Sequence, residues 1–425
     1  MGLEPRNAAV RRRLPSLIGA LILLSCVQAR ASTIDSPLVQ TALSDGIKNL
    51  YDLEYEASRG DFRKLIESEP DNPLGYLFES AQIWWQSSAE YGLFKGTPTL
   101  QGLFEQDIEF ALKKAKPLLK AKDDAVETDG HFVTGMALGT KGMWNILRWN
   151  WLAACVEGKK ALGHLKDTIK ADPEYYDAYL GLGIFDYQAA HLPAVVKPVA
   201  LLCGARGNEK RGLERMQLAM EKGRYLRRQA AQFMASIYII DQQDYARALT
   251  LIHGLRADYP DSPYFKYLEA VIKFRLGDWS GSLPLVKELS AAFQADPPRF
   301  QRKLLTFVCS LSGKDCLCRQ DVELAFKFFN YAVENLKPDD PPEWAAMARL
   351  YRGHAADMLG KRKDAEADYR WVLDHPAFLD GHLRAADCLK KRCNSDRNLR
   401  YLQALSKGEE YRPQDEPGPK PAGGQ

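Results

Sequence analysis

Cysteine and histidine are the residues of this 425-residue chain that could carry chemistry, as nucleophilic thiols, disulfides or metal ligands. Beyond the first 31 residues, the cysteines are Cys155, Cys203, Cys309, Cys316, Cys318, Cys388 and Cys393. Cys316 and Cys318 form a C-x-C pair, and Cys388 and Cys393 form a second close pair near His382. These spacings suggest two kinds of chemistry: thiol–disulfide exchange and metal binding.

The spacing of these residues argues against a metal site. Tetrahedral zinc sites usually contain two tight pairs with C-x₂₋₄-C spacing, and only Cys388 and Cys393 come close to that. None of the seven histidines belongs to an H-E-x-x-H motif. We therefore predict no metal and no cofactor, and we expect the cysteines to be oxidised or buried.

No motif of a known reaction centre stands out elsewhere. The chain has no G-x-S-x-G, no paired catalytic carboxylates and no dinucleotide fingerprint. Residues 204–212 are glycine-rich and basic, but they lack the spacing of a phosphate-binding loop, so we interpret them as a helix start with Asn208 as the N-cap. The prediction is that the protein is not an enzyme.

The first 31 residues have the pattern of an export signal. Three arginines, Arg11 to Arg13, precede an apolar run over 14–25 that is too short to span a membrane as a helix. Ala29-Arg30-Ala31 fits a cleavage site that releases a soluble protein, whereas residues 23–26 resemble a lipobox that would place a lipid on Cys26. A third interpretation is that the segment is not cleaved and stays as a membrane anchor. We predict a protein exported to the periplasm or associated with the outer membrane, touching the membrane only through a possible lipid at Cys26.

The charge of the chain excludes one class of partner. The formal net charge of +3 falls close to zero without the arginine-rich leader, in a chain with 46% hydrophobic and 27% charged residues. Binding to nucleic acid draws on a basic surface that neutralises phosphates. A near-neutral chain therefore predicts no nucleic-acid partner.

Apolar residues recur at helical spacing along most of the chain. In residues 161–187 a helix ends before Asp172-Pro173 and a second helix follows, with small and large residues alternating on one face. Gly135, Gly139 and Gly142 recur on an earlier predicted helix, where missing side chains would let a neighbouring helix approach closely. The sequence thus predicts antiparallel helical hairpins.

These hairpins repeat. Asp244-Tyr245 returns 34 residues later as Asp278-Trp279, and a later unit carries small and aromatic residues at the same steps. That unit contains Gly353, Gly360, Ala365, Tyr369 and Val372. On these residues the chain resembles the tetratricopeptide-repeat superfamily, and looks most like its degenerate exported bacterial members. The resemblance implies an all-α solenoid of antiparallel hairpins in a right-handed superhelix, acting as a protein-binding scaffold with a concave groove.

The same patterns suggest how the chain is divided. We predict a signal peptide over 1–31, an N-terminal helical region of degenerate repeats or a cap over 32–125, a central solenoid over 126–310, and C-terminal repeats with a capping helix over 311–405. Residues 188–211 are predicted as an insertion within the central part. The proline- and glycine-rich tail over 406–425 is predicted to be disordered.

We predict that the groove binds a peptide or another envelope protein and that this binding serves envelope assembly. The oligomeric state stays open. The candidate partner-binding residues are Trp144, Arg148, Trp149 and Trp151, because tryptophan and arginine are favoured at binding hot spots. Packing between hairpins is the alternative role for these four side chains. Two other functions stay open: a small-ligand or lipid binder that uses the apolar insertion 191–204, and a thiol or redox protein that uses Cys316 and Cys318.

Overall fold

The computed structural model describes residues 36–91, 98–192, 197, 206–295, 309–310, 313–314, 316–317, 320–336, 342–376 and 381–393. Several predicted features lie outside these residues. They are the signal peptide 1–31 with Cys26, residues 193–196 and 198–205 of the insertion 188–211, Cys203, Cys318 and the tail 406–425.

The regular secondary structure of the described part of the chain is helical, with no strand, which confirms the predicted all-α class. Helices of the first half are α1 (Pro37–Tyr51), α2 (Tyr55–Ser68), α3 (Pro73–Tyr91), α4 (Pro98–Ala115), the 3₁₀ helix η2 (Leu118–Lys120), α5 (Asp124–Leu147), α6 (Trp151–Ala171) and α7 (Ala178–Ala190). The second half has α9 (Glu209–Lys222), α10 (Arg227–Ile240), α11 (Tyr245–Asp258), α12 (Pro263–Arg275), α13 (Trp279–Ala295), α15 (Val322–Glu334), α16 (Pro342–Met358), α17 (Arg362–Leu373) and α18 (Gly381–Lys390).

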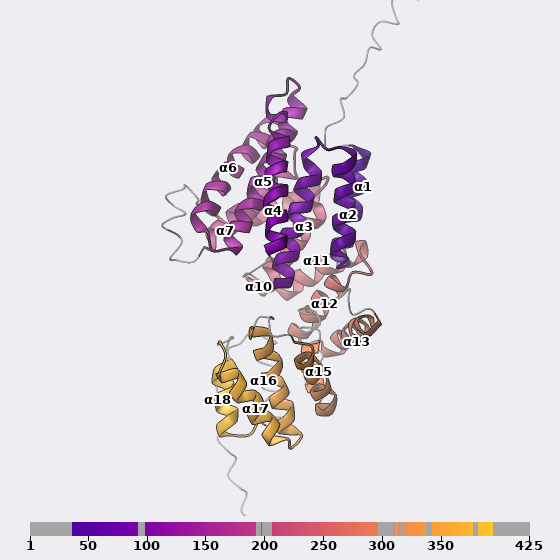
Figure 1. Ribbon diagram of the computed structural model, residues 1–425, viewed down its shortest axis with the longest axis vertical. Helices are drawn as coiled ribbons and strands as arrows, with labels where there is room; N and C mark the ends of the chain where they lie inside the picture. The colour runs from indigo at the N-terminus through magenta and orange to yellow at the C-terminus, as the bar shows by residue number, and fades with distance from the viewer. Residues whose placement is uncertain are drawn as a thin grey trace, which may run out of the picture.

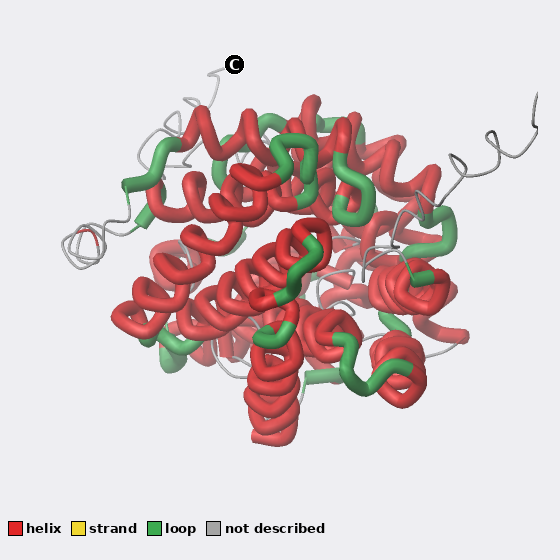
Figure 2. The backbone as a smooth tube through the Cα atoms, turned by 90° about the horizontal axis from the view of Figure 1, so that it is seen from above, coloured by secondary structure: helices red, strands yellow, loops and turns green. Residues whose placement is uncertain are grey.

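Each helix packs mainly on its neighbour in the chain, and several also touch the helix after that, as in α3 with α5 and α16 with α18. Figure 1 shows the result, with α1 to α7 at one end of the molecule and α15 to α18 at the other. The view from above shows helices joined by loops, with no strand in the part of the chain that is described (Figure 2). This pattern of consecutive contacts is that of an α-solenoid, as predicted. Among the described residues, no helix combines the length and the apolar character needed to cross a membrane.

Polar side chains start many of these helices by accepting hydrogen bonds from the first free backbone N–H groups. Asn208 accepts from the N–H of Arg211 at the start of α9, which confirms its predicted role as an N-cap. Other side chains that cap helices in this way are Asp123, Asn150, Asp244, Ser262 and Asp321.

Small residues let neighbouring helices nest, as the sequence suggests. In the unit formed by α16 and α17, the ring of Tyr369 lies where a side chain at Gly353 would be, with its nearest atom 2.6 Å from the position of a Cβ. Between α7 and α9, a Cβ on Gly183 would lie 2.8 Å from the carbonyl oxygen of Gly212, so the two backbones themselves are in contact. Glycine at these positions is therefore required by packing.

One contact joins distant parts of the solenoid. Tyr51, at the end of α1, packs against the rings of Tyr259 and Phe265, with centroids 5.1 and 4.7 Å away. The hydroxyl of Ser262 donates to the carbonyl oxygen of Tyr51 at 2.6 Å, and this bond is buried. The stack therefore curves enough for its first helix to pack on α12.

Two glycine-to-alanine variants test whether close packing of neighbouring helices requires glycine. Gly183→Ala places a methyl group against the backbone of α9, which cannot move aside as a flexible side chain would, so we expect a loss of about 2 kcal/mol in the free energy of unfolding. At Gly139 of α5 nothing lies within 4 Å of an added Cβ, so Gly139→Ala should raise stability by about 1 kcal/mol through helix propensity alone. Chemical denaturation of both variants measures these differences. Equal stability of the two variants would contradict the packing argument.

The N-terminal helices bury a charged layer. The guanidinium of Arg63 donates to the buried carboxylate of Glu79 at 3.0 Å, and Arg59 lies 3.7 Å from the same oxygen. Asp107 of α4 is also buried, and its Oδ2 atom has no hydrogen-bond partner. Burial, followed by the charge of Glu79, raises the pKa of Asp107 to about 7.

This raised pKa predicts how stability depends on pH. The folded state holds the Asp107 proton more tightly than the unfolded chain, so its contribution to stability is full near pH 4 and is lost as the pH rises to about 7. Asp107→Asn removes the cost of the buried charge, and should stabilise the protein by about 1–3 kcal/mol at pH 8 and by much less at pH 4. Glu109→Gln, on the exposed side of the same helix, is the control. Parallel unfolding curves at the two pH values measure the effect, and an equal gain at both would contradict it.

Candidate functional site

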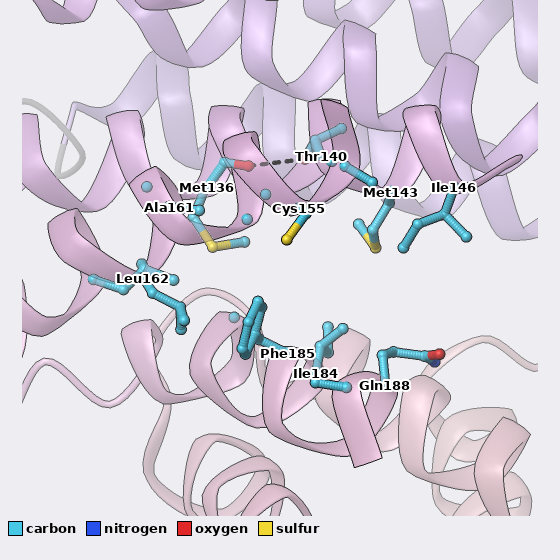
Figure 3. A pocket seen from close by; sticks show the side chains of 18 of the residues that line it. Met136, Thr140, Met143, Ile146, Cys155, Ala161, Leu162, Ile184, Phe185 and Gln188 are labelled. Atoms are coloured by element: carbon cyan, nitrogen blue, oxygen red, sulfur yellow. Dashed lines mark hydrogen bonds between the residues drawn. The ribbon is translucent and has the colours of Figure 1, made fainter. Parts of the chain in front are cut away.

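An apolar pocket lies between α5, α6 and α7. Its volume is about 140 Å³, and α5 and α6 face α7 across it in Figure 3. Side chains that line it include Met136, Met143, Cys155, Leu162, Ile184 and Phe185. The surface exposed in the pocket is nearly all apolar.

A missing side chain helps to open this pocket. Gly135 behaves as the sequence predicts, because a Cβ there would lie 2.8 Å from Leu165 of α6. The same expectation is wrong for Gly139, one turn further along α5, which meets nothing within 4 Å and lines the pocket. At Gly142 the backbone of α6 does come close, because a Cβ there would lie 3.5 Å from the carbonyl oxygen of Ala154, in ordinary van der Waals contact.

The size and lining of the pocket limit what it can hold. A sealed apolar cavity of about 150 Å³ can hold benzene, whereas sites for drug-sized ligands occupy about 300–1,000 Å³. The hydroxyl of Thr140 donates to the carbonyl oxygen of Met136 at 3.0 Å, so it is already engaged within α5. The pocket thus suits one aromatic or branched side chain, or the end of an acyl chain.

Exposed apolar side chains border the pocket. We call Trp149, Leu152 and Val156 the α6 patch, and their exposed fractions are 59%, 64% and 42%. Leu152 and Val156 are four residues apart on α6 and therefore lie on one side of it. Trp151 lines the pocket and its ring meets that of Trp149 edge to face at 5.7 Å, so the pocket adjoins the patch at Trp149.

The four predicted partner-binding residues lie in different environments in the structure. Trp144 is buried and stacks on Phe104 of α4 with ring centroids 4.1 Å apart, so it has the alternative role in the core. Arg148 is exposed and lies 3.6 Å from Glu105, also of α4. Trp149 and Trp151 lie at the pocket and its border. Leu152 and Val156, which the sequence analysis did not select, could have been found as a pair of apolar residues at helical spacing beside the tryptophans.

The backbone at Trp149 is in a conformation that favours glycine. Its φ is +60°, and it follows the last turn of α5. The N–H of Asn150 donates to the carbonyl oxygen of Asn145 at 2.9 Å, and that of Trp149 to Ile146 at 3.0 Å. This pair of bonds is the Schellman motif, in which the residue with positive φ is usually glycine.

Positive φ occurs at other helix ends of the described chain, both at glycines and at residues with side chains, and Gln243 and Gln320 are exposed like Trp149. Gly277 and Gly360 end α12 and α16 with the same pair of hydrogen bonds and positive φ values of 77° and 82°. Leu53 adopts φ 66° after α1, but its side chain is buried in the core, so packing compensates for the strain. Trp149 is largely exposed, so packing in the core does not compensate for its backbone strain. Backbone strain of this kind is often found at functional sites.

A second cleft, at the opposite end of the same three helices, is polar and larger, with a volume of about 760 Å³. Its polar groups bond to one another: the Asp177 carboxylate accepts from the N–H groups of Arg224, Tyr225 and Leu226, and Tyr175 donates to Asp129 at 2.9 Å. His164 lies 3.0 Å from His131, and burial together with that neighbour lowers the pKa of His164. These groups hold the end of α6 against α7 and α9, and we assign them a structural role.

The cysteines fall into three environments. Cys155, in the wall of the apolar pocket, is disulfide-bonded, and its partner lies outside the described residues. Cys309 and Cys316 are buried and form no disulfide, and burial raises the pKa of Cys309 to about 12, so this thiol is a poor nucleophile. Cys318, the other half of the predicted redox pair, lies outside the described residues.

Cys388 and Cys393 are also buried and form no disulfide. The hydrogen bond from Cys393, and then the neighbouring His354 and Arg384, lower the pKa of Cys388, while the same hydrogen bond and burial raise the pKa of Cys393. His382, the histidine nearest to them in sequence, instead bonds to the carbonyl oxygen of His375 at 2.7 Å.

Comparisons with known proteins add no relative: no protein-family model matches the chain, and a search of curated proteins finds no significant match. The site is therefore interpreted from its geometry alone.

The strain at Trp149 can be measured. Trp149→Gly should keep the fold and raise the free energy of unfolding by up to about 1 kcal/mol, because glycine adopts positive φ without strain. Leu53→Gly relieves the same backbone strain but removes a buried side chain, so we expect it to lower stability by about 2–4 kcal/mol. Denaturant unfolding of both variants is the measurement. A clear loss of stability in Trp149→Gly would mean that this side chain has a structural role.

Proposed function

We propose that the protein is a non-enzymatic scaffold of the tetratricopeptide-repeat type, which binds an apolar segment of a partner protein at the α6 patch and the adjoining pocket. The observation that carries the proposal is an open apolar pocket whose lining residue Trp151 contacts exposed Trp149, with Leu152 and Val156 exposed on the same helix. Exposed apolar residues that gather in one place mark interaction surfaces, whereas single ones are common on any protein.

The geometry favours an amphipathic helix or an extended peptide as the bound segment. Such a segment would lie along the first two turns of α6, and one of its apolar side chains would enter the pocket beside Gly139. Buried aromatic anchors in a pocket carry most of the binding energy at many interfaces. Trp149 would supply the aromatic contact from this chain.

The disulfide at Cys155 supports a location outside the reducing cytoplasm, since disulfides persist mainly in oxidising compartments. Together with the apolar leader over 14–25, it supports our proposal that the protein is exported to the periplasm or the outer membrane. The partner would then be another protein or a peptide of the cell envelope.

A second candidate function is the binding of a small apolar ligand or the end of a lipid chain. The nearly uniform apolar lining and the volume of about 140 Å³ favour it. The two functions use different parts of the site, because a small ligand needs the pocket and a protein partner needs the α6 patch as well.

Three variants separate these functions. Gly139→Leu adds a side chain to the pocket wall where an added Cβ meets nothing within 4 Å, Trp149→Gly removes the aromatic ring of the α6 patch, and Ile240→Ala removes an exposed apolar side chain of α10. We expect crosslinking in envelope fractions to identify a partner that the wild type and Ile240→Ala capture and that the other two lose by tenfold or more. Native mass spectrometry of the same proteins tests for a retained small ligand.

A ligand that is lost in Gly139→Leu but kept in Trp149→Gly would favour the small-ligand function. Equal capture of every partner by all four proteins, with no retained ligand, would refute both functions at this site.

A further inference from the structure

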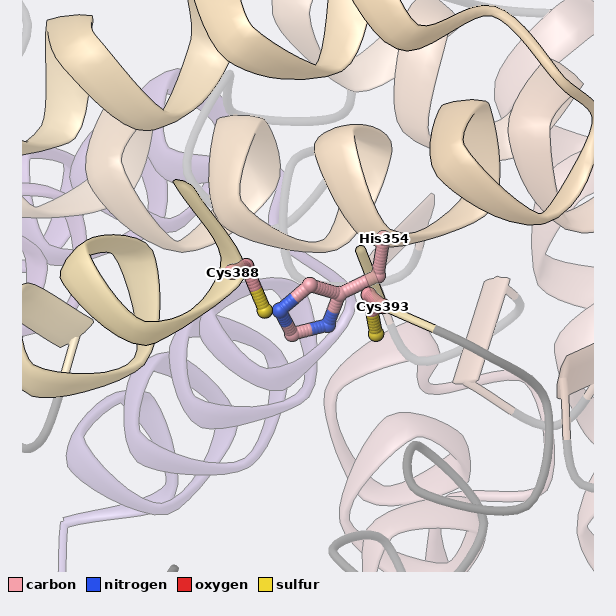
Figure 4. Close-up of side chains that lie close together, drawn as sticks. All are labelled: His354, Cys388 and Cys393. Carbon is pink, nitrogen blue, oxygen red and sulfur yellow. The ribbon is translucent and has the colours of Figure 1, made fainter. Parts of the chain in front are cut away.

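A histidine and two cysteines meet in the buried core of the C-terminal hairpins. One side-chain atom from each of His354, Cys388 and Cys393 can be chosen so that all three lie within 4.8 Å of one another. All three residues are buried, and His354 is not exposed at all. Figure 4 shows the imidazole with a sulfur atom on either side of it.

Two parts of the chain bring these side chains together. His354 lies on α16, Cys388 lies in the last turn of α18, and Cys393 follows the end of that helix at Lys390. After α18 the chain turns back, so the sulfur of Cys393 reaches the sulfur of Cys388. The cluster therefore links the last described helix to α16.

A buried ion pair fixes the backbone of both cysteines. Asp357 accepts from Arg362 at 2.9 Å and from the backbone N–H of Cys393 at 3.0 Å. Arg362 also donates to the carbonyl oxygen of Cys388 at 2.9 Å. Tyr369 donates to Asp357 at 3.0 Å, so this carboxylate already has several donors and acts as a support rather than as a further ligand. The two sulfur atoms are thus held in place before anything binds.

We propose that His354, Cys388 and Cys393 form a binding site for a thiophilic metal ion with a filled d shell, Zn²⁺ or Cu⁺. Thiolate sulfur and imidazole nitrogen are the ligands that these ions prefer. Two sulfurs at about 2.3 Å from zinc with tetrahedral angles are about 3.8 Å apart, so the cluster needs at most a small contraction.

The charges balance when the metal binds. Both thiols give up their protons to solvent and form metal–sulfur bonds, and His354 binds as the neutral imidazole. With Zn²⁺ the three-ligand site is neutral. With Cu⁺ it carries one negative charge, and the buried guanidinium of Arg384, whose charge acts on both cysteines, offsets it.

Such a site would be structural, because its residues are buried and it joins α18 to α16. The competing chemistry is a disulfide between Cys388 and Cys393, which an oxidising compartment permits. The structure has a disulfide at Cys155, whereas these two cysteines lie beside a histidine and are not disulfide-bonded. Metal binding and a disulfide exclude each other here, since one pair of sulfur atoms cannot serve both.

The experiment uses the full chain, purified without added chelator. Elemental analysis should find about one zinc or copper ion per chain, and competition with a Zn²⁺ chelator or a Cu⁺ chelator should show which of the two is held more tightly. Cys388→Ser and His354→Gln should lose the metal. Cys309→Ser, which changes a buried thiol elsewhere, and His382→Gln, which changes the histidine nearest in sequence, should retain it. Asp357→Asn should weaken metal binding by about 10–100-fold, as loss of a supporting group does.

The wild type gives a readout that does not depend on the folding of any variant. Reconstitution with Co²⁺ should give thiolate-to-cobalt charge-transfer absorption, and removal of the metal should increase hydrogen exchange in α18 more than in α5. A Cys388–Cys393 disulfide found by mass spectrometry in protein purified without reductant would overturn the proposal. So would two free thiols that take up neither Zn²⁺, Cu⁺ nor Co²⁺.

Discussion

Contact between the backbones of consecutive helices is the constraint on which this structure depends. Gly183 of α7 and Gly212 of α9 bring two helices so close that a single methyl group would meet backbone atoms. The same principle operates at Gly353, where the ring of Tyr369 fills the space of the missing side chain. Because each such contact joins neighbours in the chain, hairpins can be added one after another, and no single central core is needed.

The candidate binding site arises where this nesting is incomplete. Gly135 and Gly139 are one turn apart on α5, yet only Gly135 is covered by Leu165 of α6. The space left at Gly139 becomes the wall of an apolar pocket, and the turn between α5 and α6 places the strained, exposed Trp149 beside it. An open gap and an unfavourable backbone conformation both reduce stability, so their occurrence together is what singles out this part of the surface.

The two ends of the solenoid are held by interactions that differ from the repeated ones. At the start, Tyr51 and Ser262 join α1 to α12 across more than two hundred residues. At the other end, the Asp357–Arg362 ion pair fixes the turn after α18 and brings Cys388 and Cys393 to His354. A stack of hairpins has exposed faces at its ends, and contacts of this kind stabilise the terminal helices.

The sequence by itself determined the helices, their pairing into hairpins and the N-cap at Asn208, because these depend on propensity and spacing within some forty residues. Only the tertiary structure decided which glycines are covered, that Trp144 is buried while Trp149 is exposed, and that His354 rather than His382 lies beside the cysteines. Helical periodicity places a side chain on one side of its helix, but it does not say which other helix lies there. That depends on the rotation between successive hairpins, which accumulates along the stack and brings residues distant in sequence into contact.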